Sequence, residues 1–410
     1  MRAAWLVLLA CLAGVVVTVL LTVPFPVLSG AHPHVDVLRD FTPQQVTREQ
    51  AYHGAVRPPA YLSLALSLVV AGFLGLTKWG GRLVGALPGH WTVKVLLGTT
   101  IVLALGQLVT LPLDVQTERV LRRYGLSTQD WAGWTDDQLR GLAVKVVTTW
   151  IVLVVMLALA RRSPDRWWLP GAAVAAVFTV VASFAYPVVI EPVFNSFTPM
   201  PAGQLRTDLL ALAAKDHVKV SDVLVADASK RTTALNAYVS GFGSTRRIVV
   251  YDTLLTTATP QEVELVVAHE LGHAKRNDVL HGTIIGAFAA AAGVIALFLL
   301  LSWAGLLARI GAPGAGDVRV VPVVLFLAAV APLLFAPLTN LVSRHIEARA
   351  DMHALDLTHD VPTYIASEKK LATTNISDLS PNWLVYNLFF THPSDPQRLA
   401  LAREWERLHS

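Results

Sequence analysis

Seven stretches of the chain are long and apolar enough to cross a membrane as helices. A spanning helix needs about 20 apolar residues, because hydrocarbon offers no hydrogen-bond partner to a free backbone amide. The stretches lie at roughly 5–28, 59–77, 95–113, 145–160, 168–190, 283–308 and 320–341. The sequence therefore predicts a mainly α-helical, multi-pass membrane protein of about seven transmembrane helices.

The composition excludes the other broad classes. Only 15% of the 410 residues are charged and 54% are hydrophobic, whereas a soluble domain carries about 25% charge. The single cysteine, Cys11, rules out a disulfide framework or a cysteine-rich metal site. No basic tract is dense enough to bind nucleic acid, so we expect the lipid bilayer and not nucleic acid as a partner.

The first apolar stretch allows two interpretations. Its length exceeds the ~7–15 apolar residues of a secretory signal, which favours a retained helix. Cleavage near Ser29-Gly30-Ala31 is the alternative. The stretches hold hardly any Asp, Glu, Lys or Arg, which argues against an ion or proton pathway.

The motif His269-Glu270-Leu271-Gly272-His273 is the strongest chemical signal in the chain. Thr259 is placed to cap the helix that contains this motif, and Glu262 completes a capping box. Residues four apart on a helix share one face, so both imidazoles can bind one Zn²⁺. Glu270 then lies beside the metal, where it can take a proton from water.

A catalytic zinc needs a third protein ligand and one open position. The segment SRHIEARADMHALD (343–356) offers Glu347, His345 and His353, and spacing alone does not choose among them. The helix of the motif runs into the sixth apolar stretch, and Glu347 follows the seventh. An antiparallel pair formed by these two stretches would bring 269–273 and 347 to the same membrane face.

Blocks of sequence around the motif resemble the type I CAAX prenyl endopeptidases, which are integral-membrane zinc metalloproteases related to the bacterial heat-shock membrane protease. Five blocks occur in the family's order: IEPVFNSFTPM (190–200), SKRTTALNAYVSGFGSTRRIVVYDTLL (229–255), HELGH (269–273), SRHIEARAD (343–351) and FFTHPSDPQR (389–398). The resemblance implies a zincin-like metalloprotease domain with one zinc ion per chain.

The resemblance also implies roles for single residues. It assigns Glu347 as the third zinc ligand beside His269 and His273, and Glu270 as the general base. Asp351 would hold the second nitrogen of a ligand histidine. Asn236 and Arg398 would contact the substrate, and His392 would steady the oxyanion. The plainer alternatives are a turn asparagine for Asn236 and a loop-capping histidine for His392. Arg344 could pair with Glu347 or Asp351, or form a surface salt bridge.

Four parts follow along the chain. They are 1–190, with five transmembrane helices and a polar helical hairpin at 114–144 broken at Gly125; 191–282, a catalytic loop domain with a small β-sheet and the motif helix; 283–341, a transmembrane hairpin; and 342–410, a helical part that completes the zinc site. Strands are expected at 222–227, 236–241 and 247–252.

These features predict a membrane endopeptidase that hydrolyses peptide bonds with zinc-activated water. Its substrate would be a peptide or protein, either lipid-modified or membrane-associated. Lys and Arg counts on the two membrane faces nearly tie, so the cytoplasmic placement of the zinc site follows from the resemblance alone. The alternatives are a heat-shock-type quality-control protease and a non-catalytic transporter or scaffold. Asp278 is expected only to cap or pair near the motif helix.

Overall fold

The structure, a computed structural model, describes residues 1–410 except for the side chain of Ser244. Seven helices are long and apolar enough to cross a membrane, as the sequence predicted. They are α1 (Arg2–Thr22), α3 (Pro43–Leu76), α5 (Trp91–Arg123), α6 (Trp131–Arg162), α7 (Trp168–Ala185), α12 (Asp278–Leu301) and α14 (Val321–Thr358).

Several of these helices continue well past their apolar stretch. α14 has 38 residues, and at 1.5 Å per residue it is about 57 Å long, whereas the hydrocarbon layer is about 30 Å thick. Its last turns therefore leave the apolar layer and carry Glu347 and Asp351 into the catalytic part. The predicted hairpin at 114–144 consists likewise of the ends of α5 and α6, with a turn at Gly125, whose φ is +77°.

Two of the predicted spans end earlier than expected. α1 stops at Thr22, before Pro24 and Pro26, because a residue that precedes proline is disfavoured in the helical region. α12 ends at Leu301, and the short helix α13 (Ala304–Ile310) follows it.

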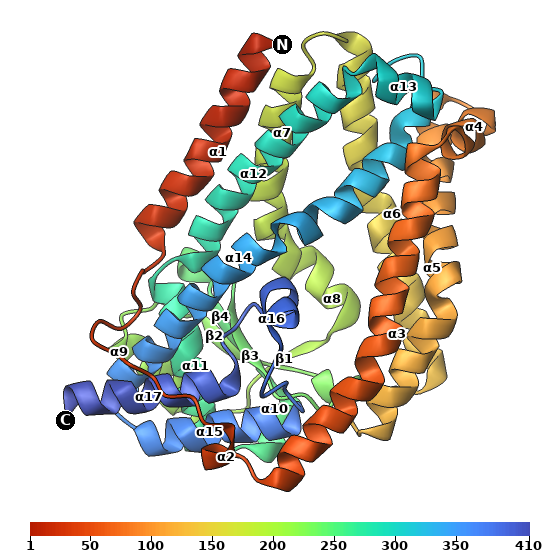
Figure 1. Ribbon diagram of the computed structural model, residues 1–410. Helices are drawn as coiled ribbons and strands as arrows, with labels where there is room; N and C mark the ends of the chain where they lie inside the picture. The colour runs from red at the N-terminus through yellow and green to blue at the C-terminus, as the bar shows by residue number, and fades with distance from the viewer.

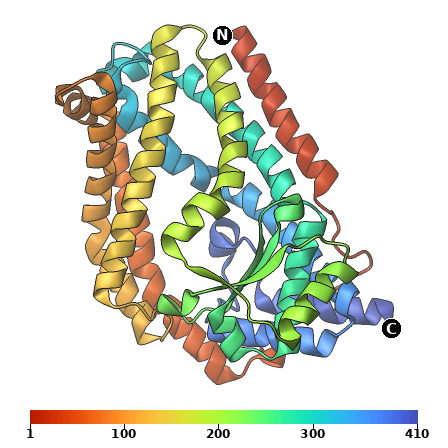
Figure 2. The ribbon, with the colours of Figure 1, turned by 180° about the vertical axis from the view of Figure 1, so that it is seen from behind.

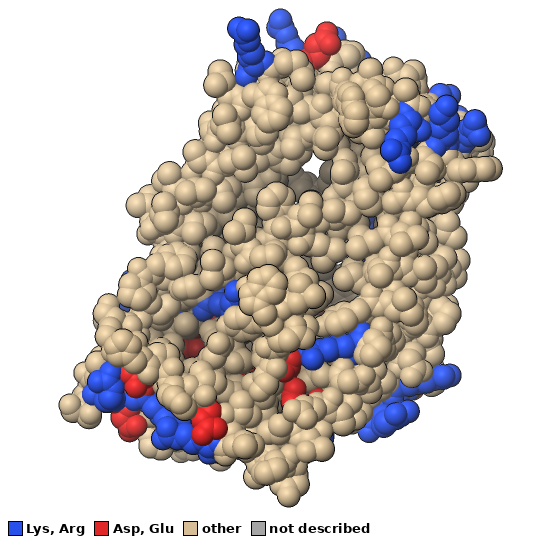
Figure 3. Space-filling view, in the orientation of Figure 1, with Lys and Arg blue, Asp and Glu red and all other residues tan. Residues whose placement is uncertain are grey.

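The long helices form two groups joined by α14. α1 and α7 both pack against α12, and α3 packs against α5 and α14. Figure 1 shows α1, α7 and α12 on one side and α3, α5 and α6 on the other, with α14 running between them. Figure 3 shows Lys, Arg, Asp and Glu gathered at the two ends of the molecule, with a band almost free of charge between them. This band is the part of the surface that suits lipid.

A small mixed sheet lies at the end of the molecule where the chain terminates (Figure 2). Its strands are β1 (Phe197–Pro199), β2 (Asp222–Ala226), β3 (Ala237–Ser240) and β4 (Arg247–Tyr251), in the order β1-β2-β4-β3. β2 is parallel to β4, and β1 and β3 are antiparallel to their neighbours. The three predicted strands are confirmed, whereas β1 was not predicted. The sheet order leaves β3 at an edge.

The helix of the motif, α11 (Pro260–Lys275), packs on this sheet. Val267 and Leu271 of α11 join Ile248 and Val250 of β4 in one buried apolar cluster, which also includes Leu209. The other helices are α2 (Val37–Asp40), α4 (Lys78–Ala86), α8 (Glu191–Phe194), α9 (Gln204–Lys215), α10 (Asp252–Thr257), α15 (Val361–Thr374), α16 (Trp383–Phe389) and α17 (Asp395–His409). α15 and α17 pack on each other beside α11 and α14.

Candidate metal centre

The motif helix begins as its sequence predicts. The Thr259 hydroxyl accepts from the Glu262 amide at 3.3 Å, and the Glu262 carboxylate accepts from the Thr259 amide at 2.7 Å. Pro260 occupies the first turn, where a missing N–H costs nothing. This capping box fixes where α11 starts and therefore the direction in which His269 and His273 point.

α11 and α14 approach each other closely beside the motif. A Cβ atom at Gly272 would lie 3.1 Å from Cβ of His353, closer than most such contacts. Glycine therefore lets the two helix backbones come together, and Glu347 on α14 reaches the histidines of α11 from the side.

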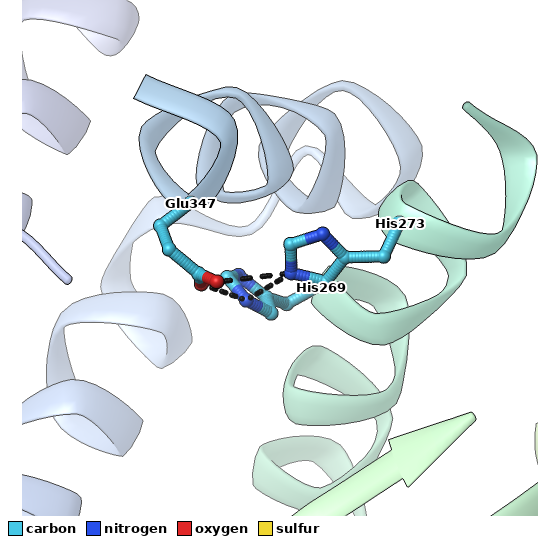
Figure 4. A group of neighbouring side chains, drawn as sticks. All are labelled: His269, His273 and Glu347. Atoms are coloured by element: carbon cyan, nitrogen blue, oxygen red, sulfur yellow. Dashed lines mark hydrogen bonds and ion pairs between the residues drawn. The ribbon is translucent and has the colours of Figure 1, made fainter. Parts of the chain in front are cut away.

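Three side-chain donor atoms converge at this crossing (Figure 4). His269 Nε2 lies 3.2 Å from Glu347 Oε2 and 3.2 Å from His273 Nε2, and His273 Nε2 lies 3.5 Å from Glu347 Oε2. Ligand atoms about 2 Å from a tetrahedral zinc ion are about 3.3 Å apart. The spacing of these three donors therefore fits a zinc ion, and two imidazoles with one carboxylate are a donor set that zinc accepts in catalytic sites.

A carboxylate holds the other nitrogen of each imidazole. His269 Nδ1 lies 2.9 Å from Asp351 Oδ1, and His273 Nδ1 lies 2.9 Å from Asp278 Oδ2. Such contacts fix the ring orientation and leave Nε2 for the metal. The first contact has the geometry that the resemblance implies for Asp351, whereas Asp278 was expected only to cap or pair near the motif helix.

The surroundings of the two imidazoles favour positive charge. Burial lowers the pKa of His269, but hydrogen bonds to Asp351 and Glu347 outweigh burial and raise that pKa well above its usual value. For His273, burial is again opposed by the Asp278 and Glu347 carboxylates, and the pKa rises to about 9. In the metal-free protein these carboxylates hold protons on the rings, and the same field attracts a divalent cation.

The other two candidates for the third ligand are bonded elsewhere. His345 Nδ1 lies 2.9 Å from the Leu341 carbonyl oxygen on its own helix, and His353 Nε2 lies 2.9 Å from Asp216 Oδ2. Arg344 forms neither a surface salt bridge nor a pair with Glu347 or Asp351. It is buried and donates to the carbonyl oxygens of Tyr386 and Phe390, so it fixes α16 against α14.

Glu270 lines two adjoining cavities. The larger has a volume of about 410 Å³ and is also lined by His269, Asn236, His392 and Arg398. The smaller lies along the continuation of β3 and is also lined by His273. Burial raises the pKa of Glu270, and the neighbouring imidazoles counteract this only in part. A carboxylate with a raised pKa is a better proton acceptor than an ordinary surface glutamate.

The remaining predicted residues surround the larger cavity. Asn236 immediately precedes β3 and is exposed. The side chain of His392 is 55% exposed, and its Nε2 lies 3.1 Å from Glu347 Oε2 at the mouth of the site. Arg398 is turned inward, where its Nε donates to Asp351 Oδ2 at 2.9 Å and its guanidinium also pairs with Glu368.

Sequence reasoning missed two charged residues that support the site, Arg349 and Glu368, and expected of Asp278 only that it would cap or pair near the motif helix. Arg349 pairs with Asp278, and Glu368 shares Arg398 with Asp351. The spacing of Asp278 from His273 was an available signal, because α11 ends within one turn of His273. The left-handed residue Asn277, with a φ of +55°, then turns Asp278 back toward the imidazole. Glu368 gave no local signal.

Known proteins are similar to the chain over nearly its whole length. The family model described as peptidase family M48 matches residues 199–406, and that described as the CAAX prenyl protease N-terminal part, with five membrane helices, matches residues 42–196. An uncharacterized metalloprotease of Bacillus subtilis is 31% identical over 301 residues, covering 73% of this chain and 71% of that protein.

Relatives in eukaryotes and one crystal structure agree with these matches. A CAAX prenyl protease 1 homolog of Arabidopsis thaliana is 27% identical over 340 residues, covering 80% of this chain and 79% of the relative. The crystal structure of S. mikatae Ste24p superposes with a TM-score of 0.79 at 21% identity, covering 97% of this chain and 98% of that chain. At this identity the superposition establishes the fold.

Proposed function

The chain belongs to peptidase family M48 and is a membrane metalloprotease of the CAAX prenyl protease type, and from this premise we propose how its site works. His269, His273 and Glu347 hold one catalytic zinc ion, and Glu270 is the general base. The observation that carries the proposal is the convergence of three donor atoms, all within 4.8 Å of one another, beside a buried glutamate.

Zinc held by these residues would polarise a peptide carbonyl group and lower the pKa of a water molecule. Glu270 takes a proton from the attacking water and passes it to the nitrogen of the leaving amine, so that the C–N bond breaks as the new C–O bond completes the acid. The raised pKa of Glu270 suits both steps, because the group must accept the proton and release it again. His392, at the mouth of the site, is placed to donate to the oxyanion.

We assign the supporting residues by what they contact. Asp351 orients His269. Arg398 lines the larger cavity, where the substrate would bind, and its guanidinium holds Asp351. Asn236 lines the larger cavity with Glu270, and Val239 of the edge strand β3 lines the smaller one with it. An extended peptide can add to such an edge by main-chain hydrogen bonds, with the Asn236 amide near the scissile bond.

The substrate in this proposal is a peptide at the membrane. The seven spanning helices and the names of the relatives support a membrane-associated substrate with a lipid-modified end. A quality-control protease of the heat-shock type is the second candidate, and the five membrane helices matched by the CAAX prenyl protease model favour the first. Cleavage of one quenched peptide with and without a lipid on its cysteine separates the two.

The direct test combines metal analysis with peptide cleavage in detergent. We expect the purified protein to contain one zinc per chain and to cleave the peptide, with loss of cleavage in a chelator and recovery on adding zinc. Glu270→Gln should keep the zinc and lose about 10³-fold in rate. Glu264→Gln is the matched control, since Glu264 lies on the same helix but is not among the residues lining either cavity. Wild-type rates in Glu270→Gln would overturn the assignment of the base.

The zinc site is placed on the cytoplasmic side in this proposal. The C-terminal helix α17 carries Arg398 and packs on α14, so the C-terminus and the metal ligands share one membrane face. A reporter fused after Ser410 that is active only outside the cytoplasm tests this. Activity of that reporter would mean that the zinc site faces away from the cytoplasm, and it would leave the proposed chemistry unchanged.

A further inference from the structure

The contact that orients His273 continues into a chain of polar groups. Asp278 is the first residue of α12 and accepts from His273 through Oδ2. Its other oxygen, Oδ1, pairs with the guanidinium of Arg349. Arg349 follows Glu347 by two residues on α14, so this arginine and the third donor of the metal site come from the same turn of one helix. One carboxylate therefore joins α11, α12 and α14 at the metal centre.

The same arginine also binds the end of the first membrane helix. Its Nη1 donates to the carbonyl oxygen of Thr22 at 2.7 Å, and Thr22 is the last residue of α1. The last carbonyls of a helix have no partner within the helix, and they form the negative end of its dipole. A guanidinium is well suited to such an end, because it can donate to the carbonyl and to Asp278 at once.

α1 is fixed in place by packing on both sides of this contact. Ala4 and Leu8 are buried in an apolar core together with residues of α12, and Figure 1 shows α1 running alongside α12. Beyond Thr22, Val27 and Leu28 pack against the apolar cluster that contains Leu265 of α11. The end of α1 is therefore held at a defined distance from the motif helix. The two family models match residues 42–196 and 199–406, so α1 lies before both of them.

We propose that Asp278 and Arg349 are positioning residues for His273 and that they are anchored on the end of α1, which makes the first membrane helix part of the scaffold of the zinc site. The inference rests on the proposed function in one respect, namely that His273 binds zinc. Arg349 holds the Asp278 carboxylate in place, and Asp278 in turn orients the His273 ring so that its Nε2 is free for the metal.

The first experiment measures zinc affinity by competition with a chromophoric chelator, on the full-length protein in detergent. Asp278→Asn and Arg349→Gln should each weaken zinc binding by about 10-fold to 100-fold. Arg349→Lys keeps the charge but cannot reach both Asp278 and the Thr22 carbonyl oxygen. Its zinc affinity should therefore lie between that of these two variants and that of the wild type. It also remains informative if Arg349→Gln does not fold.

Arg403→Gln is the matched control. Arg403 pairs with both oxygens of Asp40 and so ties another N-terminal segment to α17, with burial close to that of Arg349 but without contact to a proposed zinc ligand. Its zinc affinity should stay within about 2-fold of the wild type. If Arg349→Gln and Asp278→Asn bind zinc as tightly as Arg403→Gln, the positioning role is wrong.

The second experiment tests the anchor on α1 by hydrogen exchange. A coupling between two sites is reciprocal, so zinc should slow amide exchange in residues 23–30 of the wild type, and Arg349→Gln should abolish this effect of zinc. Zinc-dependent protection that persists in Arg349→Gln would overturn the anchor. Absence of zinc binding by the wild type would instead overturn the proposed function, so the two failures are distinguishable.

Discussion

The two histidines of the site are held by the same kind of contact in two different surroundings. Asp351, which holds His269, is fully buried, and its arginine, Arg398, continues to the buried Glu368 among the C-terminal helices. The side chain of Asp278, which holds His273, is 11% exposed, and its arginine leads to the end of α1. We call Asp351 with Arg398 and Glu368 the Asp351 arm, and Asp278 with Arg349 the Asp278 arm. The Asp351 arm is part of the interior of the catalytic domain, whereas the Asp278 arm joins that domain to the membrane helices.

This difference predicts which property each arm controls. Breaking a fully buried ion pair leaves an uncompensated charge and costs about 3–5 kcal/mol, whereas a partly exposed pair costs much less. Both arms should affect zinc affinity, because both orient a ligand. Only the Asp351 arm should also contribute strongly to the stability of the fold.

The largest effect is expected for Asp351→Asn. Arg398 keeps only the Glu368 carboxyl group as a partner in that variant, so the free energy of unfolding should fall by about 4 kcal/mol and zinc affinity by about 100-fold. Chemical denaturation and chelator competition measure the two. Asp40→Asn is the control, because Asp40 is also buried and paired with an arginine, Arg403. Equal zinc affinity in both variants would contradict the proposed role of Asp351.

The next effect is a dependence of stability on pH that comes from Glu368. Burial raises the pKa of Glu368 from its usual value near 4.5 to about 7, although Arg398 acts in the opposite direction. The folded protein therefore binds this proton more tightly than the unfolded chain, and stability should fall by about 3 kcal/mol as pH rises from about 4.5 to 7. Above pH 7 this contribution should stay constant.

Glu368→Gln should flatten the curve of unfolding free energy between these pH values. Denaturation at a series of pH values, run in parallel for the wild type and the variant, measures the difference. An unchanged slope would mean that Glu368 is ionised throughout this range, and that the buried arm carries two carboxylates against one guanidinium.

A smaller effect is expected at the helix crossing on which both arms depend. Gly272→Ala places a methyl group 3.1 Å from Cβ of His353, which should cost about 1–3 kcal/mol and weaken zinc binding by moving Glu347 away from the histidines. Gly282→Ala is the control, since a Cβ there meets nothing within 4 Å among the described residues. Similar zinc affinities for the two variants would show that the crossing tolerates a wider spacing.

The smallest effect on stability is expected for Asp278→Asn. The Arg349 and Asp278 side chains are 17% and 11% exposed, so their pair is less buried than that of Asp351, and its loss should lower the free energy of unfolding by about 1 kcal/mol while zinc affinity falls by about 10-fold. Measuring both quantities in this variant and in Asp351→Asn compares the arms directly. A loss of stability as large as that of Asp351→Asn would remove the distinction between them.

The local signals in the sequence were sufficient for the parts that depend on near neighbours. Seven apolar stretches predicted the spanning helices. Thr259 and Glu262 predicted the start of α11, and alternation predicted the strands β2, β3 and β4. Helix ends were less well predicted, because α14 and α3 continue as helices beyond the apolar layer, where hydropathy no longer marks them. β1 was missed because three residues are too short for a pattern.

In the candidate site, too, the sequence predicted the residues that are close along the chain and not the contacts between separate helices. The spacing of His269, Glu270 and His273 carries its own chemistry, because a helix brings residues four apart to one face. The choice of Glu347 over His345 and His353 depended on which side chain faces α11 across the crossing at Gly272. Arg349 and Glu368 were not assigned any role, and Asp278 was expected only to cap or pair near the motif helix, because their partners lie on other helices.

By itself the sequence determined that this chain is a membrane protein and that it carries two imidazoles and a glutamate arranged for a hydrolytic metal. Periodicity and apolar length act within one helix, so they can be read along the chain. Only the tertiary structure decided which side chain lies beside the two imidazoles and which charges support that group. Those contacts join residues 71 and 82 positions apart, as in Asp278 with Arg349 and His269 with Asp351, and the packing of separate helices alone sets their distances.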